Sequence, residues 1–119
     1  MTAVLIIEDD DEIREILAEM LVERGYSVVT ARNGEEGLAA MRVAPPPCLV
    51  LLDLMMPVMD GWQLRKEMLA DPVLAEIPVV VVSGAADVGE SAALKAANVL
   101  TKPVKWPVLL ASVREYCTT

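Results

Sequence analysis

Acidic side chains follow two apolar stretches of this sequence, at the point where each stretch ends. Glu8 and Asp9 come directly after the apolar run Val4–Ile7, and Asp53 comes after the run Cys48–Leu52. Continuous apolar runs of this length are typical of strands that are buried on both faces. If the two strands are neighbours in a parallel sheet, their carboxyl ends meet at one edge, and the three carboxylates converge there.

Three converging carboxylates require a cation. Two unit charges ~4 Å apart repel by about 4 kcal/mol at an effective dielectric near 20. Ligand sets that consist only of oxygen atoms favour Mg²⁺, or Mn²⁺, over zinc. We therefore expect Glu8, Asp9 and Asp53 to bind Mg²⁺, with Mn²⁺ as a possible substitute.

Two further polar residues end apolar runs. Ser83 follows Val79–Val82, and Lys102 follows Val99–Thr101. A metal ion, an ammonium group and a hydroxyl group suit a phosphoryl ligand, because the cations neutralise its oxygens while the hydroxyl donates a hydrogen bond. Asp53 stands alone at the end of its strand, so it could act as the nucleophile and form an aspartyl phosphate.

The rest of the pattern alternates between apolar runs and amphipathic segments, which predicts an α/β fold. The expected strands are Val4–Ile7, Tyr26–Ala31, Cys48–Leu52, Val79–Val82 and Val99–Thr101. The expected helices are a first one with its apolar stripe from Ile13 to Leu21 and its end near Gly25, then Glu35–Met41, Trp62–Leu69 with Asp60 as N-cap, Glu90–Ala97, and a last one from about Pro107 to Tyr116. We expect a doubly wound parallel sheet of five strands in the order 2-1-3-4-5, with helices on both faces. Asp10, Asp11 and Glu12 are expected to cap the first helix and to interact with its dipole.

Length and composition limit the function classes. The chain has 119 residues, 55% of them hydrophobic, which fits one domain over residues 1–119 with an aliphatic core. The formal charge of −8 argues against direct binding of nucleic acid or of an anionic membrane. The sequence contains no His, which excludes a His-based catalytic triad and a His metal site.

The cysteine content and the N-terminal residues indicate a soluble protein of the cytoplasm. Cys48 and Cys117 are too few for a disulfide framework or a zinc site, and we interpret them as reduced, chemically idle thiols. The N-terminal residues have no basic region of a signal peptide. No apolar run approaches the ~18 residues that a membrane helix needs.

Four motifs in order resemble the receiver domain of two-component response regulators, over essentially the whole chain. They are Leu5–Asp10 (LIIEDD), Leu51–Gly61 (LLDLMMPVMDG), Val80–Gly84 (VVVSG) and Leu100–Pro103 (LTKP). The resemblance implies a flavodoxin-like receiver fold, similar to single-domain chemotaxis receivers. It also implies a phosphorylatable signalling switch rather than an enzyme.

The resemblance also assigns roles to single residues. It implies that a sensor histidine kinase phosphorylates Asp53, and that Glu8 and Asp9 bind Mg²⁺ together with the backbone carbonyl of Met55. It makes Ser83 the switch hydroxyl and Lys102 the cation of the site, with a cis bond between Lys102 and the proline that follows.

The sequence departs from the family at two positions. Val99 stands where receivers usually carry the Tyr or Phe that rotates with the switch hydroxyl, and Val104 stands where an aromatic residue commonly follows Lys-Pro. Both departures fall on the usual signalling face and leave the phosphorylation site untouched.

Other functions agree less well with these residues. The leading interpretation is a receiver without an output domain, which signals to an unknown downstream protein. The alternative is a pseudo-receiver, a protein-interaction module that acts without phosphorylation. An aspartyl-phosphate hydrolase usually has a second Asp two residues after its nucleophile, and this position is Met55. The glycine-rich motifs of mononucleotide-binding proteins are absent from the sequence.

Overall fold

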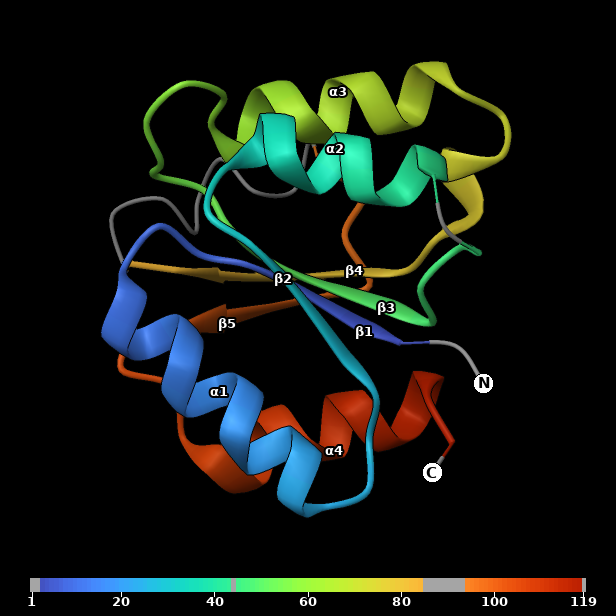
Figure 1. Cartoon of the computed structure of the whole chain (residues 1–119). Helices are drawn as coiled ribbons and strands as arrows, with labels where there is room; N and C mark the ends of the chain where they lie inside the picture. Colours follow the sequence, from blue (N-terminus) through green and yellow to red (C-terminus); the bar gives the residue numbers. More distant parts are fainter. Residues whose placement is uncertain (1–2, 44, 85–93, 119) are drawn as a thin grey trace.

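A five-stranded parallel sheet forms the centre of the molecule in the computed structural model, which describes residues 3–43, 45–84 and 94–118 (Figure 1). The strand order is β2-β1-β3-β4-β5, as predicted, and every neighbouring pair is parallel. The strands are β1 (Val4–Ile7), β2 (Val28–Ala31), β3 (Leu49–Asp53), β4 (Val79–Ser83) and β5 (Asn98–Thr101). All carboxyl ends therefore lie at the same edge of the sheet.

Helices cover both faces of the sheet. Figure 1 shows α1 (Asp11–Glu23) and α4 (Trp106–Tyr116) on one face, with α2 (Gly34–Val43) and α3 (Gly61–Ala70) on the other. A short 3₁₀ turn over Leu74–Glu76 precedes β4. Because successive side chains of a strand point to opposite faces, each strand contributes to two separate cores. Leu5 and Ile7 lie in the core under α2 and α3, and Val4 and Ile6 lie in the core under α1 and α4.

Local sequence signals set the helix boundaries. The Asp10 carboxylate accepts a hydrogen bond from Ile13 N–H at 3.1 Å and caps α1, as predicted. The first helix ends where Gly25 adopts a φ of 91°, a conformation that glycine reaches at no steric cost. Asp60 and Gln63 form a reciprocal capping box at the start of α3.

Two predicted elements differ from the structure. The second strand begins at Val28 rather than at Tyr26, because Tyr26 N–H donates to the Leu21 carbonyl and so belongs to the connection that closes α1. The expected helix Glu90–Ala97 lies partly outside the described residues, which resume at Leu94. Over residues 94–97 the chain forms no α-helix.

The interpretation of the two cysteines as reduced, idle thiols is wrong in this structure. Cys48 and Cys117 form a disulfide with their Cα atoms 5.4 Å apart. Cys48 precedes β3, and Cys117 follows the last residue of α4. Their separation of 69 positions gives no local signal of this proximity, which arises only when α4 packs along the sheet.

Within the described part of the chain, no helix combines the length and apolar character needed to cross a bilayer.

A buried arginine connects α3 to the segment that leads into β5. Arg65 is 4% exposed, and its Nε donates to the Leu94 carbonyl at 2.7 Å. Its Nη2 donates to the Lys95 carbonyl at 3.2 Å. Burial lowers the pKa of Arg65. These bonds fix the backbone just before β5, the strand that leads to Lys102.

The loop from β3 to α3 contains a strained turn. Val58 has a φ of 69°, and Met59 N–H donates to the Pro57 carbonyl at 2.8 Å across it. A turn of three residues with a positive φ at its centre is rare and strained. A β-branched residue in this region is an outlier, since its Cβ crowds the backbone. The side chain of Val58 is 72% exposed, so little packing offsets the strain.

Replacing Val58 by Asn is therefore expected to stabilise the fold. Asn tolerates a positive φ better than Val, and the gain should be about 1 kcal/mol, or roughly 4 °C in melting temperature. Val22→Asn is a matched control, because Val22 is also exposed but lies within α1. Thermal unfolding of both variants measures the difference. A Val58→Asn variant no more stable than the wild type would show that the turn carries no strain.

Candidate functional site

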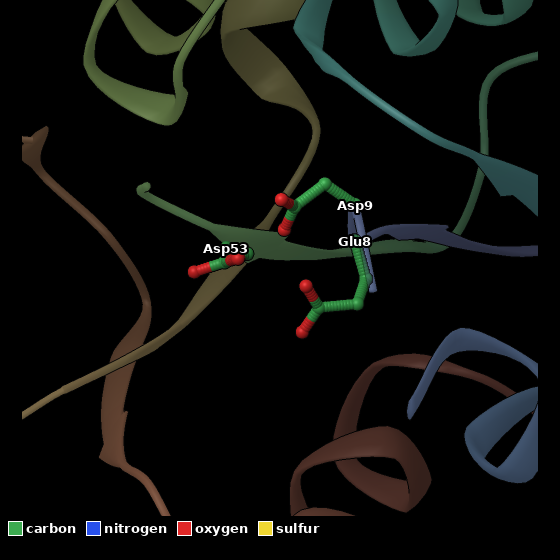
Figure 2. Close-up of side chains that lie close together, drawn as sticks. All are labelled: Glu8, Asp9 and Asp53. Carbon is green, nitrogen blue, oxygen red and sulfur yellow. The ribbon is translucent and has the colours of Figure 1, made fainter. Parts of the chain in front are cut away.

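Three carboxylates meet at the edge of the sheet where β1 and β3 end. Ile7 of β1 pairs with Leu52 of β3, so Glu8 and Asp53 leave the sheet side by side. Carboxylate oxygens of Glu8, Asp9 and Asp53 all lie within 4.8 Å of one another. Figure 2 shows the three side chains gathered around one point. The convergence predicted from the sequence is thus present in the fold.

The three acids differ in exposure. Glu8 and Asp53 are 4% and 6% exposed, whereas Asp9 is exposed. Partial burial raises the pKa of Asp9, and its hydrogen bond with Glu8 and the negative charge of Glu8 raise it further. Desolvation first, and the neighbouring Glu8 second, thus make the negative charge of Asp9 costly.

Lys102 supplies a positive charge to the same place. Its Nζ lies 3.0 Å from Glu8 Oε1 and 3.5 Å from Asp53 Oδ1. Burial alone would lower the pKa of Lys102, but the hydrogen bond to Glu8 and the charges of Asp53 and Glu8 outweigh it and raise the pKa. The side chain therefore stays an ammonium group. The predicted cis bond between Lys102 and Pro103 is present.

Ser83 ends β4 at the same edge. Asp53 pairs with Val82, so Ser83 stands one position beyond the level of Asp53 on the neighbouring strand. Its side chain is fully buried, and its hydroxyl lies 3.4 Å from the Gly84 carbonyl as a donor. The Ser83 carbonyl accepts a hydrogen bond from Lys102 N–H at 2.7 Å. This backbone hydrogen bond thus holds Lys102 next to the end of β4, at the site.

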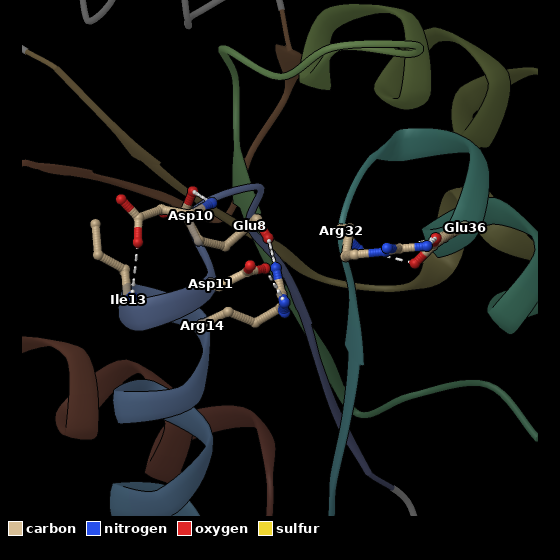
Figure 3. Close-up of polar contacts among 7 residues, drawn as sticks. All are labelled: Glu8, Asp10, Asp11, Ile13, Arg14, Arg32 and Glu36. Carbon is tan, nitrogen blue, oxygen red and sulfur yellow. Dashed lines mark hydrogen bonds and ion pairs between the residues drawn. The ribbon is translucent and has the colours of Figure 1, made fainter.

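Arg14 supports the site and is not among the site residues predicted from the sequence. Its Nη1 donates to the Glu8 carbonyl at 2.9 Å, and its guanidinium also pairs with Asp11 (Figure 3). The sequence signal for this role was the position of Arg14, one turn into the helix that follows the acidic run. A second pair in Figure 3 joins Arg32, in the turn after β2, to Glu36 of α2 on the surface and takes no part in the cluster.

Gly61 fixes the backbone that follows Asp53. Its N–H donates to the Leu54 carbonyl at 2.9 Å. A Cβ at this position would lie 2.6 Å from the Asp53 carbonyl oxygen and 2.8 Å from Leu54 Cα. Both obstacles are backbone atoms, so only glycine allows α3 to start this close to the end of β3. The Met55 N–H in the same loop donates to Asp53 Oδ1 at 3.4 Å.

The donor set fits a hard divalent cation. Every ligand candidate in the cluster is a carboxylate oxygen, which Mg²⁺ and Mn²⁺ prefer. Lys102 offsets one of the three negative charges, so the remaining charge matches a divalent ion. The backbone carbonyl of Met55 as a further ligand stays a prediction.

Comparison with known proteins gives one family throughout. The family described as "Response regulator receiver domain" matches residues 4–114. The transcriptional regulatory protein AfsQ1 of Streptomyces coelicolor is 35% identical over 114 residues, which cover 96% of this chain and 50% of that protein. A probable transcriptional regulator, ycf27 of Pyropia yezoensis, is 38% identical over 89 residues, which cover 71% of this chain and 33% of that protein. The chain thus spans at most half of the length of these two relatives.

Solved structures agree with the sequence comparison. The signal receiver domain of a signal transduction histidine kinase from Syntrophus aciditrophicus superposes with a TM-score of 0.89 at 33% identity, covering 98% of this chain and 89% of that one. The flavodoxin-like strand order is thus shared with a receiver domain of known structure. With a family match over nearly its whole length and a receiver fold around the acid cluster, this chain belongs to the response regulator receiver domains of two-component signalling systems.

Proposed function

We propose that a sensor histidine kinase phosphorylates this domain on Asp53 and that the phosphoryl group changes the surface offered to a downstream protein. One observation carries the proposal. Asp53 is a nearly buried carboxylate with an ammonium group 3.5 Å from its Oδ1 and two further acids within 4.8 Å. A purely structural Asp at a strand end needs none of these neighbours.

The chain's own residues suit each part of the transfer. The phosphorus–nitrogen bond of the kinase's phosphohistidine breaks while an Asp53 carboxylate oxygen forms its bond to phosphorus. The Lys102 ammonium group is close enough to stabilise the negative charge that develops on the phosphoryl oxygens. Ser83 supplies a hydroxyl donor at the same edge of the sheet. Arg14 and Gly61 hold the backbone on either side of these groups.

Glu8, Asp9 and Asp53 are the residues that we propose to hold Mg²⁺, with Mn²⁺ as a substitute and the Met55 carbonyl as a fourth oxygen. The ion supplies positive charge to the phosphoryl oxygens during transfer. Two of the carboxylates are nearly buried, so bulk water screens their mutual repulsion poorly. The fold therefore holds a site that is unfavourable without cations and suited to a divalent one.

The change of the partner-binding surface has to occur without the rotation of an aromatic side chain on β5, because the residue at that position is Val99. This side chain is half-buried against the core under α2 and α3, and its β-branched shape gives it one stiff torsion. We propose that Ser83 and Lys102 carry the change instead, because the Ser83 hydroxyl donates to the Gly84 carbonyl and the Lys102 N–H donates to the Ser83 carbonyl. Residues 1–119 act as one cytoplasmic receiver domain in this account, and their charge of −8 favours a protein over nucleic acid as the direct partner.

Phosphorylation should occur on Asp53 alone. Incubation of the chain with a small phosphodonor and Mg²⁺ should add one phosphate by intact-mass measurement, and Asp53→Asn should abolish the addition. Asp60→Asn is the matched control, because Asp60 is the next acid along the chain and Asn preserves a helix cap. Equal labelling of Asp53→Asn would refute the assignment. A wild-type chain that takes up no phosphate would support the pseudo-receiver alternative.

Removal of the Lys102 charge should tighten the binding of Mg²⁺. The ammonium group competes with the metal for Glu8 and Asp53, so Lys102→Met should lower the dissociation constant for Mg²⁺ roughly tenfold. Lys66→Met removes the same net charge from an exposed position of α3 and should change it little. Isothermal titration calorimetry at fixed ionic strength measures both. Weaker binding by Lys102→Met than by the control would place the metal elsewhere.

A further inference from the structure

The disulfide lies at the opposite end of the sheet from the acid cluster. Cys48 immediately precedes Leu49, the first residue of β3, whereas Asp53 is the last residue of that strand. Figure 1 shows the start of β1 and the end of α4 at this far end, away from the carboxyl ends of the strands. The phosphorylation site and the disulfide therefore act on different parts of the fold.

The two sulfur atoms have different surroundings. Cys117 is 4% exposed and belongs to the apolar core under α1 and α4. Cys48 is half-buried at the margin of the same core. Because Cys48 is the more exposed of the two residues, we expect an external thiol to attack there rather than at Cys117. In a reduced chain, a Cys48 thiol would have the Ala3 carbonyl 3.5 Å away as an acceptor.

The two ends of the disulfide are held by different parts of the fold. Cys48 N–H donates to the Ala3 carbonyl at 3.0 Å, and three prolines, Pro45–Pro47, stiffen the segment before it. Cys117 follows α4, and its N–H donates to the Val113 carbonyl at 2.8 Å. The start of α4 has a separate attachment, since Arg24 of the α1 end stacks over the Trp106 ring at 5.8 Å. The disulfide thus holds mainly the last turn of α4.

We propose that the Cys48–Cys117 disulfide is a thiol-sensitive clasp, with Cys48 as its exchange site, which gives this receiver domain a redox input separate from phosphorylation. The inference rests on the proposed cytoplasmic function, because disulfides in reducing compartments are mostly transient or redox-sensing. Opening the clasp leaves the sheet and the acid cluster in place and loosens the end of α4.

The exchange is balanced with a dithiol as the reductant. A thiolate of the dithiol attacks Cys48 Sγ, the bond between the two protein sulfurs breaks, and Cys117 leaves as a thiolate that takes up a proton. The second thiol of the reagent then attacks its own sulfur in the mixed disulfide and releases Cys48. The dithiol becomes a cyclic disulfide, and two electrons and two protons pass to the chain. Glutathione disulfide re-forms the protein disulfide by exchange with the two thiols and leaves as two molecules of reduced glutathione.

The experiment compares the oxidised chain with the chain reduced by dithiothreitol. Reduction should add two mass units and lower the melting temperature by roughly 10 °C, because the disulfide no longer restricts the unfolded chain. Amide hydrogen exchange should quicken over residues 114–118 by roughly tenfold or more and stay nearly unchanged over residues 106–110 and 49–53. Phosphate uptake by Asp53 should be similar in both states.

The controls separate this proposal from the phosphorylation proposal. A Cys48→Ser/Cys117→Ala variant should not respond to dithiothreitol, which excludes an effect of the reagent on the rest of the chain. If glutathione disulfide leaves both thiols of the wild type alkylatable, the pair does not close and the proposal is wrong. Equal melting temperatures of the oxidised and reduced chains would also overturn it. Failure of phosphate uptake in both states would count only against the phosphorylation of Asp53.

Discussion

The repulsion among Glu8, Asp9 and Asp53 is the constraint around which this domain is organised. Parallel pairing of β1 with β3 brings the carboxylates within 4.8 Å of one another, and the two more buried ones cannot turn away into water. Lys102 reaches back from the end of β5 to offset part of the charge. The core on each face of the sheet supplies the free energy that holds this unfavourable cluster together. A divalent ion bound at this cluster would relieve the repulsion by adding positive charge.

The two ends of the sheet have different roles in this account. At the carboxyl ends, the close contact of Gly61 with the Asp53 carbonyl and the strained turn at Val58 fix the loop beside Asp53, the proposed acceptor. At the other end, the disulfide joins the start of β3 to the end of α4. Because β3 runs between the two ends, its buried residues separate the acceptor from the clasp. Each end can therefore change while the strand between them stays in place.

Much of the site could be predicted from the sequence, because its signals are local. An acid directly after a buried apolar run, as at Glu8 and Asp53, marks the end of a strand, and the flavodoxin-like strand order then brings the ends together. The disulfide could not be predicted in this way, since Cys48 and Cys117 meet only through the packing of α4. The positive φ of Val58 likewise depends on backbone geometry that no spacing rule contains.

The stability of the metal-free domain tests most directly whether the acid cluster is strained. Asp53→Asn removes one of the three charges with almost no change of shape, so it should raise the melting temperature measured in a chelator above that of the wild type. It should also reduce the further rise that Mg²⁺ produces by binding the folded state. A metal-free Asp53→Asn variant that melts at or below the wild-type temperature would contradict the account, because the carboxylates would then not oppose one another.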